Sequence, residues 1–284
     1  MNGRSKTLGE RFSGSVSYRR KVLGQHFLKS SSIVSRIIDA PGSLERAHVL
    51  EIGAGRGVLT CSLAERAARF TALEFDRRLC EELVWKLKDK SSVVVLQQDV
   101  LEFDIDSWAS ACAPLTPVIV GNIPYRITSD LLYKLIGCYQ NLSVAVLMLQ
   151  EEVARKLTAP PGGKPYGLLS VLAGYRAAVE YLFFVGRSNF SPPPKVDSAV
   201  VRLDFSASSA VATDEKMFEF LVRRLFRDRR KQIQKVLRTD PRFKLSGSRL
   251  EELARRTGID LSRRPEELSV EQFIALTAGL NDSD

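Results

Sequence analysis

The residues whose types and spacing most clearly suggest chemistry form the tetrad Asn-Ile-Pro-Tyr at 122–125. The tetrad directly follows the apolar run 118–120 and a glycine. If that run is a buried parallel strand, the tetrad lies just beyond its carboxyl end, where open α/β sheets bind ligands. Asn122 offers an amide for hydrogen bonds, Pro124 fixes the backbone, and Tyr125 offers a flat face for stacking. These groups suit an extruded nucleobase, because acceptors aimed at the hydrogens of an exocyclic amine localise its lone pair. An Asn-x-Pro turn beside a core tyrosine is the alternative that the tetrad alone leaves open.

The elements that must position the tetrad begin with a nucleotide-binding pattern. A strand-like segment at 49–52 is followed by the glycine-rich turn 53–57 and by a helical run over 58–67. Glycine at the start of such a helix lets the backbone approach a ligand closely. The third glycine comes one residue earlier than in the G-x-G-x-x-G pattern of dinucleotide folds, which weakens a nicotinamide interpretation.

Two carboxylates follow the next two strand-like segments. Glu74 comes after the segment 70–73, about twenty residues past the first glycine of the turn, where a ribose diol would be held. Asp99 comes after the segment 93–96 and can accept a hydrogen bond from a cofactor adenine amine. Each acid alone is more often a helix cap or a solvated turn residue, but their recurrence after successive strands favours a binding site.

The complete pattern predicts an α/β protein with a Rossmann-like, doubly wound sheet of seven mostly parallel strands, the last two forming an antiparallel pair. The expected strands are 49–52, 70–73, 93–96, 118–120, 144–149, 179–185 and 199–205. No strand-like segment follows, so we expect a sheet domain at 19–206 and a small all-helical domain at 207–284. Residues 1–18 are rich in Gly, Ser and Arg and are expected to form a mobile basic arm.

The expected helical domain carries a dense run of basic residues. Thr213 is the expected cap of a helix whose apolar residues recur at helical spacing. The basic residues within and after that helix are Arg223, Arg224, Arg227, Arg229, Arg230 and Lys231. Asp228 is the only acid among them, and nothing nearby in the sequence neutralises the run. We therefore expect it to face RNA phosphates, with a solvated surface as the alternative.

The composition of the 284 residues agrees with this interpretation. The hydrophobic fraction of 44% and the charged fraction of 26% are those of an ordinary globular protein, and no apolar run resembles a transmembrane helix or a signal peptide. The four cysteines stand singly and there are only two histidines, which argues against a metal site or a Ser-His-Asp triad. A net charge of +9 is typical of proteins that contact nucleic acid.

Eight segments together resemble the KsgA family of ribosomal RNA adenine dimethyltransferases, which are class I methyltransferases that use S-adenosylmethionine. The resemblance covers almost the whole chain and keeps the family's order. The segments are GQHFL at 24–28, VLEIGAGRGVLT at 49–60, ALEFD at 72–76, QQDV at 97–100, GNIPY at 121–125, YGLLSVL at 166–172, FSPPPKVDSAVVRL at 190–203 and RRKQIQKVL at 229–237.

The resemblance implies roles for individual residues. The residues it implies for S-adenosylmethionine binding are Gln25, His26, Leu28, Gly53, Gly55, Glu74, Asp99, Val100 and Asn122. Asn122, Pro124 and Tyr125 would bind the target adenosine, and Phe190 would complete an aromatic sandwich around its base. The implied reaction is dimethylation of N6 on two adjacent adenosines in the 3′-terminal hairpin loop of 16S rRNA, in the small ribosomal subunit or its precursor, as part of subunit biogenesis. We expect a cytoplasmic monomer that engages neither a membrane nor DNA and holds no metal.

Two other functions remain open from the sequence. A sister enzyme that dimethylates an adenine in 23S rRNA and confers antibiotic resistance shares the glycine loop and the tetrad. The triple proline at 192–194 looks more like the small-subunit enzyme. A non-catalytic assembly or transcription factor on the same fold is the second alternative, and the intact tetrad and glycine loop argue against it.

Overall fold

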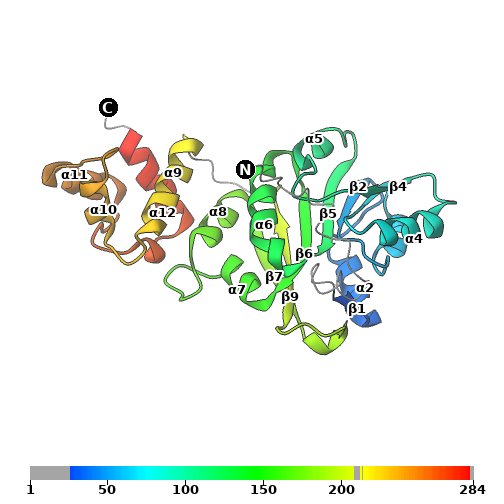
Figure 1. Ribbon diagram of the computed structural model, residues 1–284. Coiled ribbons are helices and arrows are strands. Elements are labelled where there is room, and N and C mark those ends of the chain that lie inside the picture. Colours follow the sequence, from blue (N-terminus) through cyan, green and yellow to red (C-terminus); the bar gives the residue numbers. More distant parts are fainter. Residues whose placement is uncertain (1–25, 208–211, 213, 282–284) are drawn as a thin grey trace, which may run out of the picture.

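The computed structural model describes residues 26–207, 212 and 214–281, which form a sheet with flanking helices and, beside it, a group of helices (Figure 1). The expected arm at 1–18 and the predicted cofactor contact at Gln25 lie outside the described residues.

A seven-stranded sheet forms the centre of the larger part, in the order β4-β3-β2-β5-β6-β9-β7. Its strands are β2 (Ala47–Ile52), β3 (Arg69–Glu74), β4 (Val93–Gln97), β5 (Thr116–Asn122), β6 (Val144–Gln150), β7 (Ala178–Val185) and β9 (Ser198–Asp204). Only β9 runs against its neighbours: it lies between β6 and β7 and pairs antiparallel with both. The predicted seven-stranded, mostly parallel sheet and the antiparallel pair of its last two strands are therefore confirmed.

Helices cover both faces of this sheet, as its nearly continuous apolar strands require. The first half of the chain contributes α2 (Ser31–Asp39), α3 (Thr60–Arg66), α4 (Arg77–Leu87) and α5 (Ile105–Ser110). The second half contributes α6 (Thr128–Gly137), α7 (Glu151–Leu157) and α8 (Leu168–Arg176), and short 3-10 helices are η2 (Tyr125–Ile127), η3 (Tyr139–Asn141) and η4 (Arg187–Asn189). The buried side chains of α2, α3 and α4 share one core with one face of the sheet, and those of α5 to α8 share another core with the opposite face.

A second, two-stranded ribbon lies apart from the main sheet. β1 (Phe27–Leu28) pairs antiparallel with β8 (Phe190–Ser191), so that Leu28 lies opposite Phe190. The ribbon fixes the segment around His26 against the proline-rich segment 190–198, although the two are far apart in the sequence.

The helical part consists of α9 (Glu215–Arg227), α10 (Ile233–Thr239), α11 (Gly247–Thr257), η5 (Pro265–Glu267) and α12 (Val270–Asn281). The predicted apolar face of α9 is buried, including Phe218, Leu221 and Leu225. Its cap is Asp214, whose carboxylate accepts a hydrogen bond from the Met217 amide, and not the expected Thr213. α11 ends at its cap Gly258, which has a φ of 67°, and Ser269 and Gln272 form a capping box at the start of α12.

The helical part packs on the sheet part through α8. Tyr166 donates a hydrogen bond to the Leu268 carbonyl at 2.8 Å, and its ring meets the edge of Phe226. The apolar core continues from the sheet face across α8 into α9 and α12. The predicted boundary at 206/207 falls between β9 and α9, and separate folding of the two parts stays a prediction. Among the helices of the described ranges, none is long and apolar enough to span a bilayer.

Candidate active site

A cavity lies at the carboxyl ends of the central strands. It is at the point where the order of strands in the sheet changes direction along the chain. The chain proceeds from β2 outward to β3 and β4, and then returns to place β5 on the other side of β2. Such a switch point leaves a crevice in open α/β sheets. Ile52 pairs with Gly121, so the loop after β2 begins beside Asn122 at the end of β5. Gly121 allows this approach, because a Cβ there would lie 2.8 Å from the Ile52 carbonyl oxygen.

The glycine-rich turn forms one wall of the cavity. Gly53, Gly55 and Gly57 all have positive φ angles, of 73°, 58° and 82°, which side chains rarely adopt. A Cβ at Gly53 would lie 3.4 Å from the Asn122 carbonyl oxygen, and one at Gly55 would lie 3.4 Å from the Phe27 ring. The turn is therefore shaped to bring bare backbone against a ligand.

Glu74 stands at the end of β3 beside this turn. One of its carboxylate oxygens accepts the Gly55 amide at 2.8 Å, and the other accepts the amides of Phe75 and Asp76 at 2.9 Å each. Burial raises the pKa of Glu74, and these three hydrogen bonds act against that rise. The side chain is thus held in one orientation on the cavity wall, and Oε2 keeps one lone pair for a ribose hydroxyl.

A second acid, Glu51, lines the same cavity and was not predicted as a site residue. It is 2% exposed and accepts a hydrogen bond from the Thr60 hydroxyl at 2.6 Å. Burial raises its pKa to about 8, and the nearby carboxylate of Glu74 adds to the rise. An acid inside the otherwise apolar segment 49–52 is the signal that could have revealed it.

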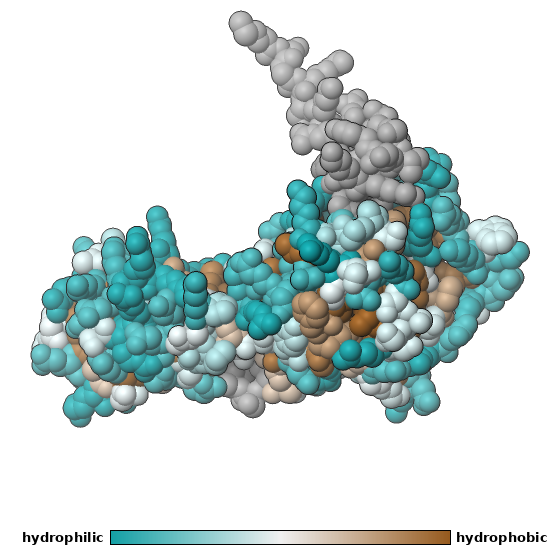
Figure 2. Space-filling view, turned by 90° about the horizontal axis from the view of Figure 1, so that it is seen from below, coloured by the Kyte–Doolittle hydropathy of each residue, from teal (hydrophilic) through white to brown (hydrophobic). Residues whose placement is uncertain are grey.

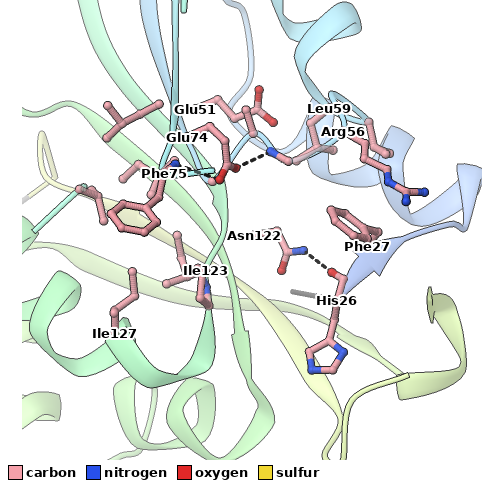
Figure 3. Close-up of a pocket in the computed structure, with 18 of the residues that line it drawn as sticks. His26, Phe27, Glu51, Arg56, Leu59, Glu74, Phe75, Asn122, Ile123 and Ile127 are labelled. Carbon is pink, nitrogen blue, oxygen red and sulfur yellow. Dashed lines mark hydrogen bonds between the residues drawn. The ribbon is translucent and has the colours of Figure 1, made fainter. Parts of the chain in front are cut away.

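The remaining walls are apolar at one end and aromatic at the other. Figure 3 shows Phe75 and Ile127 on one side of the cavity, Phe27 and Arg56 on the other, and Asn122 between them. The Arg56 guanidinium lies 4.6 Å from the centre of the Phe27 ring. A long ligand with an apolar flat end near Phe75 would pass Glu74 and reach Asn122. Phe75 was missed, although its place directly after the predicted ribose acid was a usable signal.

The tetrad presents its groups to the cavity in fixed orientations. The Asn122 amide nitrogen donates to the His26 carbonyl at 3.2 Å, which leaves Oδ1 as the amide's acceptor for a ligand. The Tyr125 ring stacks with the His26 ring at 6.1 Å between centroids. Its hydroxyl lies 2.7 Å from the Ser198 hydroxyl. Burial raises the pKa of Tyr125, so the phenol is neutral near pH 7.

Most of the predicted site residues meet at this cavity. Its lining includes His26, Leu28, Gly53, Gly55, Glu74, Asp99, Val100, Asn122, Pro124 and Tyr125. Phe190 does not line it: its side chain is 2% exposed and belongs to the core that also contains Leu28. The role of Phe190 as a second stacking platform stays a prediction.

The expectation that nothing neutralises the basic run is wrong. Arg224 forms salt bridges with Asp228 and Asp240, and Arg229 forms one with Glu266. Arg223 pairs with Glu219, and Lys231 pairs with Asp228. The acids at 240 and 266 are distant in the sequence and arrive only through the packing of the helices. In the described part of the chain Arg227 and Arg230 form no salt bridge and are exposed, so the predicted RNA contact rests on them first.

The donor set fits S-adenosylmethionine. The cavity combines a glycine turn without side chains, an oriented carboxylate that could hold a ribose, an apolar wall that could hold an adenine, and an amide oxygen that could accept a hydrogen bond.

Comparison with known proteins decides the family. The model of the family "Ribosomal RNA adenine dimethylase" matches residues 16–282. The chain belongs to the ribosomal RNA adenine dimethylase family. The protein named ribosomal RNA small subunit methyltransferase A of Chlorobium phaeobacteroides is 40% identical over 90% of this chain and 92% of its own length. The protein of the same name from Bacillus licheniformis is 37% identical over 93% and 91%.

Two solved structures share the whole architecture, including the helical part. A dimethyladenosine transferase from Plasmodium falciparum is 26% identical with a TM-score of 0.76, over 90% of this chain and 98% of that chain. The 23S rRNA methyltransferase ErmE is 29% identical with a TM-score of 0.71, over 90% and 99%. The predicted Rossmann-like methyltransferase fold is confirmed, and ribosomal RNA is the substrate class of the family.

Proposed function

We propose that this chain dimethylates N6 of two adjacent adenosines in the 3′-terminal hairpin loop of 16S rRNA, with S-adenosylmethionine as methyl donor, and acts as a monomer on the small ribosomal subunit or its precursor. The observation that carries the proposal is the meeting of Glu74 and Asn122 in one cavity at the switch point of the sheet. Glu74 ends β3 and Asn122 ends β5, the two strands that flank β2, so the sheet holds the proposed ribose carboxylate and amine acceptor at a fixed spacing.

The residues of the tetrad perform the chemistry by alignment. S-adenosylmethionine, when bound, would supply a methyl group whose carbon–sulfur bond breaks as the bond to N6 forms, with the neutral thioether as leaving group and the surplus N6 proton passing to solvent. Asn122 Oδ1 accepts a hydrogen bond from the adenine N6 and localises its lone pair for in-line attack. Tyr125 supports the base from its face, because its ring borders the cavity. Positioning and electrostatics of this kind supply the rate without a strong general base.

The target adenosine must leave its stack before it can reach the cavity. Enzymes that act on a base extrude it and read its edge with polar groups while aromatic side chains hold its face. Asn122 supplies the polar edge contact and Tyr125 the aromatic face. The Asn122 amide is already oriented by His26, so no reorganisation is needed when the base arrives.

The small-subunit substrate is supported by the curated relatives. Proteins named ribosomal RNA small subunit methyltransferase A are 37–40% identical, whereas the large-subunit methyltransferase ErmE is 29% identical. The triple proline in the segment 190–198 also agrees with the small-subunit enzyme.

One assay tests the proposal against its rival. Unmethylated small subunits, unmethylated large subunits and naked 16S rRNA are each incubated with S-adenosylmethionine, and dimethyladenosine is measured by mass spectrometry after nuclease digestion. We expect two dimethyladenosines per small subunit and none in the large subunit. Dimethyladenosine in the large subunit alone would assign the enzyme to 23S rRNA. Binding of the cofactor without any methylated product would contradict catalysis.

A further inference from the structure

The Tyr125 ring is held from behind by a residue that lies outside the cavity. Its hydroxyl forms a 2.7 Å hydrogen bond with the Ser198 hydroxyl. Ser198 is 0% exposed and is the first residue of β9, where it pairs with Gln150 on one side and with Val185 on the other. A group paired on both sides within a sheet has little freedom to move. The Ser198 hydroxyl is thus a rigid anchor for the phenol.

The same proline-rich segment also anchors the neighbouring ring. The His26 Nδ1 lies 2.9 Å from the Pro192 carbonyl oxygen, and the ribbon of β1 and β8 ties the backbone after His26 to the residues just before Pro192. The His26 and Tyr125 rings are stacked at an angle of 29°. Both members of this stacked pair are therefore bonded to the segment 190–198, one near its beginning and one at its end.

From these contacts we propose that Ser198 is a positioning residue for methyl transfer: through the Tyr125 hydroxyl it fixes the plane of the ring on which the target adenine stacks. The inference rests on the proposed function, since it concerns the same base-binding face. It adds a residue that touches neither the base nor the cofactor and explains why a rigid segment far along the chain must pack against the tetrad.

A purely structural role would predict a different result. Ser198 is absent from the lining of the cavity, so its removal should leave the cofactor contacts intact. Loss of the anchor should instead let the Tyr125 ring tilt, and a small misplacement of the reacting base lowers the rate of the chemical step. A structural role would lower the melting temperature without this selective loss of kcat.

The test is a double-mutant cycle on the full-length protein with unmethylated small subunits. We expect Ser198→Ala and Tyr125→Phe each to lower kcat by about tenfold, because both remove the same hydrogen bond and keep the aromatic ring, which is then free to tilt. The double variant should lose no more than either single variant. The dissociation constant for S-adenosylhomocysteine, measured by calorimetry, should stay within about twofold of the wild-type value in all three.

Ser170→Ala is the matched control. Ser170 is also a buried serine, 4% exposed, and its hydroxyl binds the Lys156 carbonyl at 2.5 Å, remote from the tetrad. The Ser170→Ala substitution should lower the melting temperature and leave kcat at the wild-type value. Wild-type kcat in Ser198→Ala, multiplied losses in the double variant, or an equal loss of kcat in Ser170→Ala would each overturn the proposal. A wild-type protein that methylates no adenosine would contradict the proposed function instead.

Discussion

Asn122 concentrates the recognition of the amine in one oriented amide. Its nitrogen donates to the His26 carbonyl, which fixes the orientation of the amide and leaves Oδ1, its acceptor, to receive a hydrogen of the adenine N6. We expect Asn122→Ala to lower kcat by about 10²-fold, because the lone pair of N6 then lacks its acceptor in the transition state. Binding of S-adenosylhomocysteine should change much less, because Glu74 and the glycine turn remain. Single-turnover methylation and calorimetry measure the two quantities.

The matched control for this substitution is Asn141→Ala. Asn141 also uses its amide nitrogen for a hydrogen bond, to the Asp106 carboxylate at 2.9 Å, but it lies outside the cavity. The kcat of the Asn141→Ala variant should equal that of the wild type. Methylation at the wild-type rate by Asn122→Ala would show that the tetrad does not bind the target amine.

Glu51 makes the ligand-free protein sensitive to pH. Its pKa is about 8 in the folded protein, against an ordinary value of 4.5. Between these values the folded protein retains a proton that the unfolded chain has lost. The contribution of this group to stability is therefore complete below pH 4.5 and is lost as the pH rises through about 8.

Glu51→Gln should remove this pH dependence, because glutamine resembles the protonated acid and cannot titrate. We expect the melting temperature of the wild type to fall more steeply than that of Glu51→Gln between about pH 6 and about pH 9. The measurement is thermal unfolding across that range without cofactor. Parallel curves for the two proteins would mean that the Glu51 carboxyl has the same pKa in the folded and unfolded states.

At the scale of elements, alanine substitutions at two glycines should distinguish the effect of backbone strain on stability from the effect of the glycine turn on ligand binding. Gly55 and Gly162 both have positive φ angles, 58° and 80°. A Cβ at Gly55 would contact the Phe27 ring at 3.4 Å, whereas one at Gly162 would meet nothing within 4 Å. Alanine at either position should cost about 1–2 kcal/mol of stability from the left-handed backbone.

Only Gly55→Ala should also weaken the binding of S-adenosylhomocysteine, by about tenfold, because the turn and the carboxylate that it orients face the ligand. Chemical denaturation and calorimetry on both variants give the two numbers. Equal ligand affinity in Gly55→Ala and the wild type would remove the turn from the cofactor site.

The elements of the cavity that arise from short stretches of sequence could be predicted. The strand that ends at Asn122 and the turn that begins at Gly53 follow from apolar runs and glycine spacing, and parallel strands bring their carboxyl ends to one edge. The β1–β8 ribbon was not predictable, because each strand has only two residues and the pairing joins positions 28 and 190. The anchoring of Tyr125 by Ser198 depends on tertiary packing of the same kind.

For the whole molecule, packing decides which charges remain available. The six basic residues expected on one surface include four that fold back onto acids. Arg229 also donates to the Lys164 carbonyl at 3.0 Å, so it joins the helical part to the loop before α8. In the view of Figure 2, hydrophilic side chains cover most of the helical part, while apolar side chains gather over one area of the sheet part. The density of basic residues in the sequence predicted a basic surface. Which of these side chains form salt bridges with acids depends on how the helices pack.

This division leads to opposite expectations for neighbouring arginines. Arg227→Glu with Arg230→Glu should weaken binding to small subunits while the melting temperature stays near that of the wild type, because neither side chain has a salt bridge in the described ranges. If both contact phosphates, the slope of log K against log salt should fall by about two.

Arg229→Glu should instead lower the melting temperature, because it places a second carboxylate against Glu266 and breaks the contact with the loop before α8. Filter binding at several salt concentrations and thermal unfolding distinguish the arginines that contact RNA from those that form salt bridges within the protein. Unchanged binding and an unchanged salt slope in the Arg227 and Arg230 double variant would place the RNA-binding surface on another part of the molecule. The exposed arginines would then only be solvated, which is the alternative that the sequence left open.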